Sequence, residues 1–263
     1  EHVVFAGFTH APAIELCEKL STHLPSNQAK FFFSGDGSSA VEIALKMSIQ
    51  YWKNKSEKKT RFLALDGAYH GETFGAMSAG ARNIFSAHFS ELLFESTHIP
   101  FPINENAAIS SLKTEIAKGD VAAFIFEPLV QGASGMRMYS SKTLDKLVQI
   151  CKNNDVLCIA DEVMTGFGRT GTDFSSNFYN LRPDILVAGK GMAAGYAAIS
   201  GTYSTDEIAD SILKAGYEVM FHTFAALPQS CAASTTVLKI LRRENLCERV
   251  NPLGDQLKQK LIS

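Results

Sequence analysis

The chain has 263 residues, of which 46% are hydrophobic and 20% are charged, and its net charge is −2 at pH 7. This length allows one large domain or a domain with part of another, and the near-neutral charge gives no electrostatic basis for binding nucleic acid or an anionic membrane. No apolar run approaches the roughly 20 residues that span a bilayer, and no signal peptide opens the sequence, so we expect a cytoplasmic globular protein.

The cysteine pattern argues against a disulfide scaffold or a metal site. The five cysteines are Cys17, Cys151, Cys158, Cys231 and Cys247. They form no C-x-x-C pair and no Cys/His cluster with the spacing of zinc ligands. We therefore expect reduced thiols and no bound metal.

The sequence reads as a piece of a longer polypeptide. It begins at Glu1 rather than at methionine, and Leu253, Leu257 and Leu261 still repeat at helical spacing close to the last residue. We expect residues 1–263 to form one large domain of that polypeptide.

The predicted elements begin with a helix and continue as an alternation of strands and helices. Pro12 opens the first helix, whose apolar stripe consists of Ile14, Leu16, Cys17 and Leu20. Short apolar runs then predict strands at 29–33, 61–65, 121–126, 156–160, 185–188 and 198–203. Helical spacing predicts helices at 40–47, 144–151 and 228–240. This alternation predicts an α/β fold with a mainly parallel sheet that helices cover on both faces.

A glycine-rich turn joins the first predicted strand to the following helix. Its residues are Ser34, Gly35, Asp36, Gly37, Ser38 and Ser39. Such a turn aims free backbone N–H groups and the positive end of a helix dipole at one point, which favours an anion and most often a phosphate. Many similar turns bind nothing, so the turn alone is only moderately specific.

The same turn matches the pattern G-x-G-x-x-[GA] and so opens a second interpretation, an NAD(P)-dependent oxidoreductase. That fingerprint requires an acidic residue about 20 positions further on, at the end of the second strand. Asp66 follows the 61–65 strand but lies beyond that distance from Ala40. The match is weak, and we keep it as the alternative from another class.

Polar side chains follow the later strands. Tyr69 and His70 come soon after the 61–65 strand, where they could stack on a flat cofactor or, more commonly, plug a loop into the core. Glu127 follows the next strand. Asp161 ends another strand, and Lys190 follows a fourth one between two glycines.

Asp161 and Lys190 are expected at the carboxyl edge of one sheet, where open α/β sheets bind their ligands. A partly desolvated lysine amine there is a nucleophile toward carbonyl groups, whereas a lysine on a solvated loop is inert. A buried aspartate can keep a pyridine nitrogen protonated. This pair of groups is what pyridoxal 5′-phosphate requires.

Longer motifs around these residues resemble the class III pyridoxal-phosphate-dependent aminotransferases of fold type I. They are residues 159–171, which read I-A-D-E-V-x-T-G-F-G-R-T-G, together with 183–186, 189–191, 38–42, 69–71 and 127–132. The resemblance covers essentially the whole chain. It implies the large pyridoxal-phosphate-binding domain of fold type I, with segments of the small domain missing at both ends.

The resemblance implies a role for each matched residue. Lys190 would form the Schiff base and carry protons, and Asp161 would pair with the pyridine nitrogen. Gly37 and Ser38 would bind the phosphate, and Tyr69 would stack on the ring beside the substrate.

The remaining matched residues would surround the ring and the subunit boundary. Val163 would pack on the other face of the ring, and Glu127 and Gln131 would support its polar edge. His222 and Thr223 would reach the phosphate of the partner subunit, so the resemblance implies a homodimer with shared active sites. The implied partners are a small-molecule amino donor and a keto acceptor.

Within the class, residues 8–17, 44–52 and 130–139 resemble the biotin-pathway branch, whose members transfer an amino group from S-adenosylmethionine to 8-amino-7-oxononanoate. Ala193-Ala194, Phe221 and Leu227 depart from that branch and concern the substrate. The alternatives are another class III ω-aminotransferase, which would use an ω-amino acid or amine with pyruvate or 2-oxoglutarate, and a catalytically silent member of the class. The intact Asp161 and Lys190 argue against a silent member.

Overall fold

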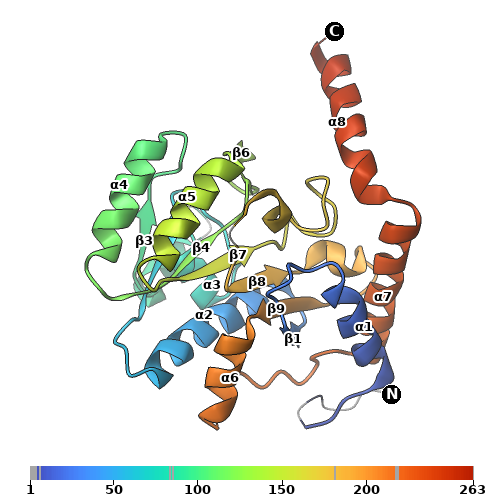
Figure 1. The fold of residues 1–263 in the computed structure, drawn as a ribbon, viewed down its shortest axis with the longest axis horizontal. Helices are drawn as coiled ribbons and strands as arrows, with labels where there is room; N and C mark the ends of the chain where they lie inside the picture. The colour runs from blue at the N-terminus through green and yellow to red at the C-terminus, as the bar shows by residue number, and fades with distance from the viewer. Residues whose placement is uncertain are drawn as a thin grey trace.

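The computed structural model describes residues 5, 7–82, 84, 86–180, 182–216 and 219–262, which are built around a seven-stranded sheet (Figure 1). The strands lie in the order β1-β9-β8-β7-β4-β2-β3. Their bounds are β1 Lys30–Ser34, β2 Arg61–Leu65, β3 Ser96–Ile99, β4 Val121–Phe126, β7 Leu157–Asp161, β8 Ile185–Ala188 and β9 Ser200–Ser204. The strands from β8 to β3 are parallel, and β9 is antiparallel to both of its neighbours. The predicted α/β class with a mainly parallel sheet is confirmed.

Helices cover both faces of the sheet. One face packs against α1 (Ala11–Ser21), α4 (Glu105–Ile116), α5 (Ser141–Lys152) and α7 (Pro228–Arg243). The other packs against α2 (Gly37–Asn54), α3 (Phe74–Ala79) and α6 (Asp206–Lys214). Because successive side chains of a strand point to opposite faces, Phe124 and Phe126 of β4 join the first core, and Ala123 and Ile125 join the second. A strand buried on both faces reads as an unbroken apolar run.

Short elements complete the described chain. A hairpin of β5 (Val130–Gln131) and β6 (Arg137–Met138) follows β4. The 3₁₀ helices are η1 (Ala87–Leu92), η2 (Ser175–Phe178) and η3 (Lys190–Ala193). Within the described residues, no helix has both the length and the apolar composition needed to cross a membrane.

The last helix, α8 (Leu246–Ile262), projects from the end of α7 away from the sheet (Figure 1, red). None of its described residues is buried. The leucines that predicted this helix, Leu253, Leu257 and Leu261, are 54%, 59% and 77% exposed. They form an apolar row that contacts little of the described chain.

Three expectations from the sequence need correction. Ile14 is not on the buried stripe of α1, because it is 48% exposed while Leu16 and Leu20 are buried. Strand β3 was not predicted, since its sequence Ser-Thr-His-Ile carries a single apolar residue. The dinucleotide alternative is wrong: the fingerprint needs two parallel, neighbouring strands, whereas β1 pairs antiparallel with β9 and lies far from β2.

Candidate active site

A cavity of about 430 Å³ lies at the carboxyl ends of the central parallel strands. Seven of the ten site residues predicted from the sequence line it: Gly37, Ser38, Tyr69, Glu127, Asp161, Val163 and Lys190. The strands β7 and β8 are parallel neighbours, so Asp161 and the segment after Ala188 emerge at the same edge. This is the place where open α/β sheets bind ligands.

Asp161 is a buried acidic group of the cavity, with 5% of its surface exposed. Its Oδ2 lies 2.7 Å from Nδ1 of His70, and its Oδ1 accepts a hydrogen bond of 3.1 Å from the backbone N–H of Val163. Since a carboxylate accepts, His70 donates through Nδ1–H. A buried carboxylate with these two donors is oriented and remains available to a further cationic donor. Sequence reasoning placed His70 near the site but gave it no partner.

A second buried carboxylate, Glu127, lines the same cavity as Asp161 and His70. Its Oε1 accepts from the Tyr69 N–H at 3.1 Å and its Oε2 from the Gly132 N–H at 2.9 Å. Burial raises the pKa of Glu127, an effect that the nearby His70 opposes and the Asp161 charge reinforces. Through its two backbone bonds, Glu127 connects the loop that carries Tyr69 to the loop that carries Gly132.

The phenol of Tyr69 faces the same cavity. Burial, then a hydrogen bond to Glu72 and the charges of Glu72 and Asp161, raise the pKa of Tyr69 to about 12. The hydroxyl therefore stays protonated at neutral pH and can donate a hydrogen bond.

The glycine-rich turn lines the same cavity through Asp36, Gly37 and Ser38. Gly37 and Ser38 begin α2, so their N–H groups precede the first intrahelical hydrogen bond. The Asp36 carboxylate caps the helix by accepting from Ser39 N at 2.9 Å. A Cβ on Gly37 would lie 2.8 Å from Cγ1 of Val163, so only glycine lets this turn approach the β7 edge so closely.

Lys190 follows β8 and begins η3. Its backbone has φ 38°, which is in the left-handed region that favours glycine. Non-glycine residues held in such conformations cost about 1–3 kcal/mol and persist only where surrounding structure imposes them. The side chain is exposed within the cavity, with Gly189 and Gly191 on either side.

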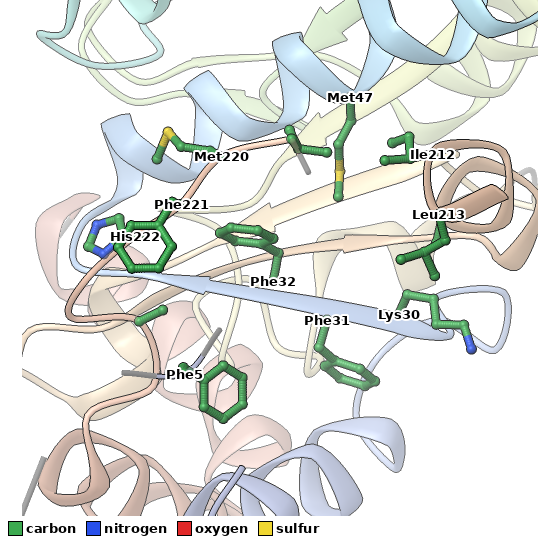
Figure 2. A pocket seen from close by; sticks show the side chains of 13 residues that line it. Phe5, Lys30, Phe31, Phe32, Met47, Ile212, Leu213, Met220, Phe221 and His222 are labelled. Carbon is green, nitrogen blue, oxygen red and sulfur yellow. The ribbon is translucent and has the colours of Figure 1, made fainter. Parts of the chain in front are cut away.

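Three predicted site residues do not line this cavity. Gln131 is fully buried, and its amide donates to the Asp66 carbonyl at 3.1 Å and accepts from Arg137 at 2.6 Å. His222 borders a different cavity of about 340 Å³, which is lined mostly by apolar side chains beside β1; Figure 2 shows its ring next to Phe221. Thr223 is exposed.

Glu162 is a buried acid beside the site for which the sequence indicated no role of its own, only a place in a motif. Glu162 is fully buried and accepts from the N–H groups of Ser175 and Ser176 at 2.7 Å and from the Thr165 hydroxyl at 2.8 Å. Burial raises the pKa of Glu162 against the opposing effect of these hydrogen bonds. Glu162 ties the end of β7 to η2 and so anchors the loop between them.

The profile of the family described as "Aminotransferase class-III" matches residues 1–263. The chain belongs to the class III aminotransferase family. It is 44% identical over 254 residues to the adenosylmethionine-8-amino-7-oxononanoate aminotransferase of Synechococcus elongatus, an alignment that covers 92% of this chain and 60% of that protein. It is 34% identical over 281 residues to the Staphylococcus aureus protein of the same name, with 99% and 62% covered. The chain thus spans less than two thirds of the length of these relatives.

Solved structures share the fold. The adenosylmethionine-8-amino-7-oxononanoate aminotransferase of Methanocaldococcus jannaschii superposes with a TM-score of 0.90 at 34% identity, covering 95% of this chain and 60% of the other. An amine transaminase from an uncultivated Pseudomonas species, solved in its PLP-bound form, gives a TM-score of 0.92 at 33% identity, with 97% and 62% covered. The chain therefore has the α/β fold of the fold type I transaminases.

Membership of this family implies pyridoxal phosphate as the cofactor. The residues present fit that group. The cavity combines a buried carboxylate, a lysine amine and the amino end of the 18-residue helix α2, whose close approach to Val163 depends on the missing Cβ of Gly37. These are the partners that a protonated ring nitrogen, an aldehyde and a phosphate require.

Proposed function

We propose that the polypeptide to which this chain belongs catalyses pyridoxal-phosphate-dependent amino transfer from S-adenosylmethionine to 8-amino-7-oxononanoate. The observation that carries the proposal is that Lys190, Asp161 and the start of α2 line one cavity. Relatives that are 34–44% identical and carry the name of this activity support the choice of substrates.

Each residue of the cavity has a proposed task. Lys190 would hold the cofactor through Nζ and later move a proton to and from the carbon that bears the amino group. Asp161, held by His70, would keep a proton on the ring nitrogen through its carboxylate. When bound, pyridoxal phosphate supplies a conjugated ring that accepts the electron pair left on that carbon.

The walls of the cavity would bind and orient the same group. Gly37 and Ser38 would donate their N–H groups to the phosphate, with help from the helix dipole of α2. Tyr69 and Val163 border the cavity and would enclose the ring, while Glu127 fixes the Tyr69 loop. Gln131 would act only indirectly, through its bonds to the Asp66 carbonyl and Arg137.

We also propose that the protein is a homodimer and works in the cytoplasm, with residues 1–263 as its large domain. His222 and Thr223 would then serve the phosphate site of the partner. Their position outside the cavity of their own chain and the exposure of the adjoining Phe221 and Phe224, 54% and 60%, support this arrangement.

The cofactor proposal is tested on the full-length protein by absorbance. Wild-type protein should show the visible band of lysine-bound pyridoxal phosphate, and Lys190→Ala should lose it. Asp161→Asn should keep the cofactor but slow amino transfer by two or more orders of magnitude, because an amide cannot hold the ring nitrogen as a charged pair. Near-normal turnover of Asp161→Asn would contradict its role.

The substrates are tested by adding amino donors one at a time to the cofactor-loaded protein. S-adenosylmethionine should bleach the visible band, whereas β-alanine, lysine and ornithine should leave it. Rapid bleaching by β-alanine or ornithine and none by S-adenosylmethionine would replace the biotin-pathway substrates with those of an ω-aminotransferase. The proposed roles of Lys190 and Asp161 would be unaffected.

A further inference from the structure

A cluster of polar side chains outside the cavity meets at Asp173. Nδ1 of His23, which follows α1, lies 3.1 Å from its Oδ1. A guanidinium nitrogen of Arg242, near the end of α7, lies 3.2 Å from its Oδ2. Sγ of Cys247, in α8, donates to Oδ1 at 3.6 Å. His23 is only 5% exposed, so its bond to the carboxylate is largely removed from water.

The backbone of Asp173 closes a loop that begins after the Asp161 strand. Its carbonyl accepts from the N–H groups of Phe167 at 2.6 Å and Gly168 at 3.4 Å. Phe167 has φ 57°, an unfavourable left-handed conformation for an aromatic residue. Because such a conformation is held from outside, the bond to Asp173 is part of what maintains it.

The loop is packed tightly on both sides. On the outer side, a Cβ on Gly168 would lie 3.1 Å from Sγ of Cys247, and one on Gly171 would lie 2.9 Å from the Asn251 side chain. On the inner side, a Cβ on Gly191 would lie 3.1 Å from Cβ of Phe167. Residues 167–173 thus separate the α7–α8 junction from the residue next to Lys190.

Phe167 and Lys190 are both non-glycine residues in left-handed conformations. Phe167 packs against Gly191, which is the residue bonded to Lys190. If the Phe167 turn moved toward the outside, the contact that backs the Lys190–Gly191 backbone would be lost. Lys190 could then relax toward an ordinary conformation, and its amine would move from its place in the cavity that it lines together with Asp161.

We propose that Asp173 is a positioning residue for Lys190: with His23 and Arg242 it clamps the Phe167 turn, and that turn holds the Lys190 backbone in its left-handed conformation. The proposal rests on the proposed function of Lys190 and deepens it. Neither His23, Asp173 nor Arg242 lines the cavity, so any effect of these residues on the lysine must pass through the loop.

The test uses Asp173→Asn in the full-length protein, with Arg242→Met as a second variant that leaves Asp173 in place. Glu15→Gln is the matched control: it breaks a 2.7 Å ion pair between the same helices α1 and α7 that does not touch the loop. Four quantities are measured for each protein: the melting temperature and the amide exchange rates of residues 190–195 without cofactor, the dissociation constant for pyridoxal phosphate, and the pH midpoint of the visible band of the bound cofactor.

Asp173→Asn and Arg242→Met should weaken cofactor binding by a factor of roughly 2 to 30 and move the pH midpoint of the band, because coupling through a packed segment typically transmits effects of that size. In the cofactor-free protein, amide exchange of residues 190–195 should quicken in both. Glu15→Gln should change none of these.

A lower melting temperature with unchanged binding, midpoint and exchange in both variants would make the cluster a purely structural link and overturn the proposal. If Asp173→Asn does not fold, Arg242→Met decides by the same criteria. A wild-type protein without a visible band, or a Lys190→Ala variant that retains it, would instead contradict the proposed function and with it the role of Asp173.

Discussion

At the scale of single residues, the site depends on a close approach between Gly37 and Val163 that only a glycine allows. Gly37 approaches Val163 so closely that a Cβ would lie 2.8 Å and 3.0 Å from its two Cγ atoms. Both residues line the cavity, and both belong to segments that carry proposed cofactor contacts. The contact between the Gly37 backbone and the Val163 methyl groups therefore limits the width of the cavity at this point.

Gly37→Ala should weaken cofactor binding by about tenfold, although alanine is the better helix former, because forcing an extra methyl into a packed contact costs about 1–3 kcal/mol. Fluorescence titration with pyridoxal phosphate measures the effect. Val163→Ala, which removes the opposing methyl groups, should restore much of the binding in the double variant.

The control for this prediction is Gly35→Ala in the same turn, where the added Cβ would meet only ordinary contacts of 3.8 Å with His222. It should bind the cofactor nearly as well as wild type. Equal losses in both variants, or no recovery in the Gly37→Ala, Val163→Ala protein, would show that the contact with Val163 is not the cause.

The sequence predicted which polar side chains stand at the ends of strands, but not which side chains from distant parts of the chain contact them. Asp161 could be placed because it directly follows an apolar run, and Lys190 because only Gly189 separates it from one. The bond from His70 to Asp161 joins positions far apart in the chain, and no local pattern encodes it. The same holds for His23 and Asp173.

At the scale of elements, Arg61 joins the start of β2 to β3, to α4 and to the residue that precedes β4. It contacts Asp120 before β4 at 2.7 Å, Glu115 of α4 at 2.8 Å and Thr97 of β3 at 2.9 Å. Its side chain is 17% exposed. The guanidinium therefore adds side-chain bonds to the backbone pairing of β2 with β3 and β4 at this edge of the sheet.

Arg61→Met should lower the free energy of unfolding by about 2 kcal/mol at pH 7, since hydrogen bonds to charged groups contribute about 1.5–3 kcal/mol. The hydrogen bond from Arg61 lowers the pKa of Asp120 below its usual 3.8, against the opposing effect of burial. A carboxyl whose folded pKa is lowered stabilises the fold above its unfolded pKa and loses that contribution as the pH falls through the folded value.

The difference in the free energy of unfolding between wild type and Arg61→Met should therefore have its full value at pH 7 and shrink as the pH falls below about 4. Urea unfolding curves at several pH values measure it. Lys30→Met is the control. Both side chains of its 3.4 Å ion pair with Asp206 are exposed, so losing this pair should change the free energy of unfolding little. A difference that stayed constant down to pH 3 would rule out the Asp120 carboxyl as its source.

Strands were predictable from the sequence where both of their faces are buried, because such strands consist almost entirely of apolar residues. The strands β4 and β8 begin and end where their apolar runs do, and β2 differs only by the Arg61 at its start. Strand β3 could not be found this way, because only its last residue is apolar and its pairing with β2 is what makes it a strand. The order of the strands also lay beyond the sequence, since periodicity does not reveal that β9 is inserted between β1 and β8.

At the scale of the whole molecule, the proposed dimer predicts that two defective subunits can make one good site. Lys190→Ala damages the cavity of its own subunit, whereas Thr223→Val would damage the phosphate site of the partner. A mixed dimer then has one site with both defects and one with neither.

Mixing and refolding the two full-length variants should therefore restore cofactor absorbance and amino transfer to a fraction of the wild-type level, while each variant alone stays deficient. Sedimentation equilibrium should give the mass of two subunits. If Thr223→Val alone is normal, or if the mixture remains as inactive as its components, the shared site is disproved.

The antiparallel insertion of β9 also has a consequence for the time course of synthesis. Within the described chain, the edge strand β1 pairs with β9 alone, and Lys30 pairs with Ser204. A ribosome that adds about 5–20 residues per second needs roughly 10–30 s to make the intervening roughly 170 residues. During that interval the nascent segment with Phe31, Phe32 and Phe33 has no strand to pair with, which makes it the natural binding site for a chaperone on the growing polypeptide.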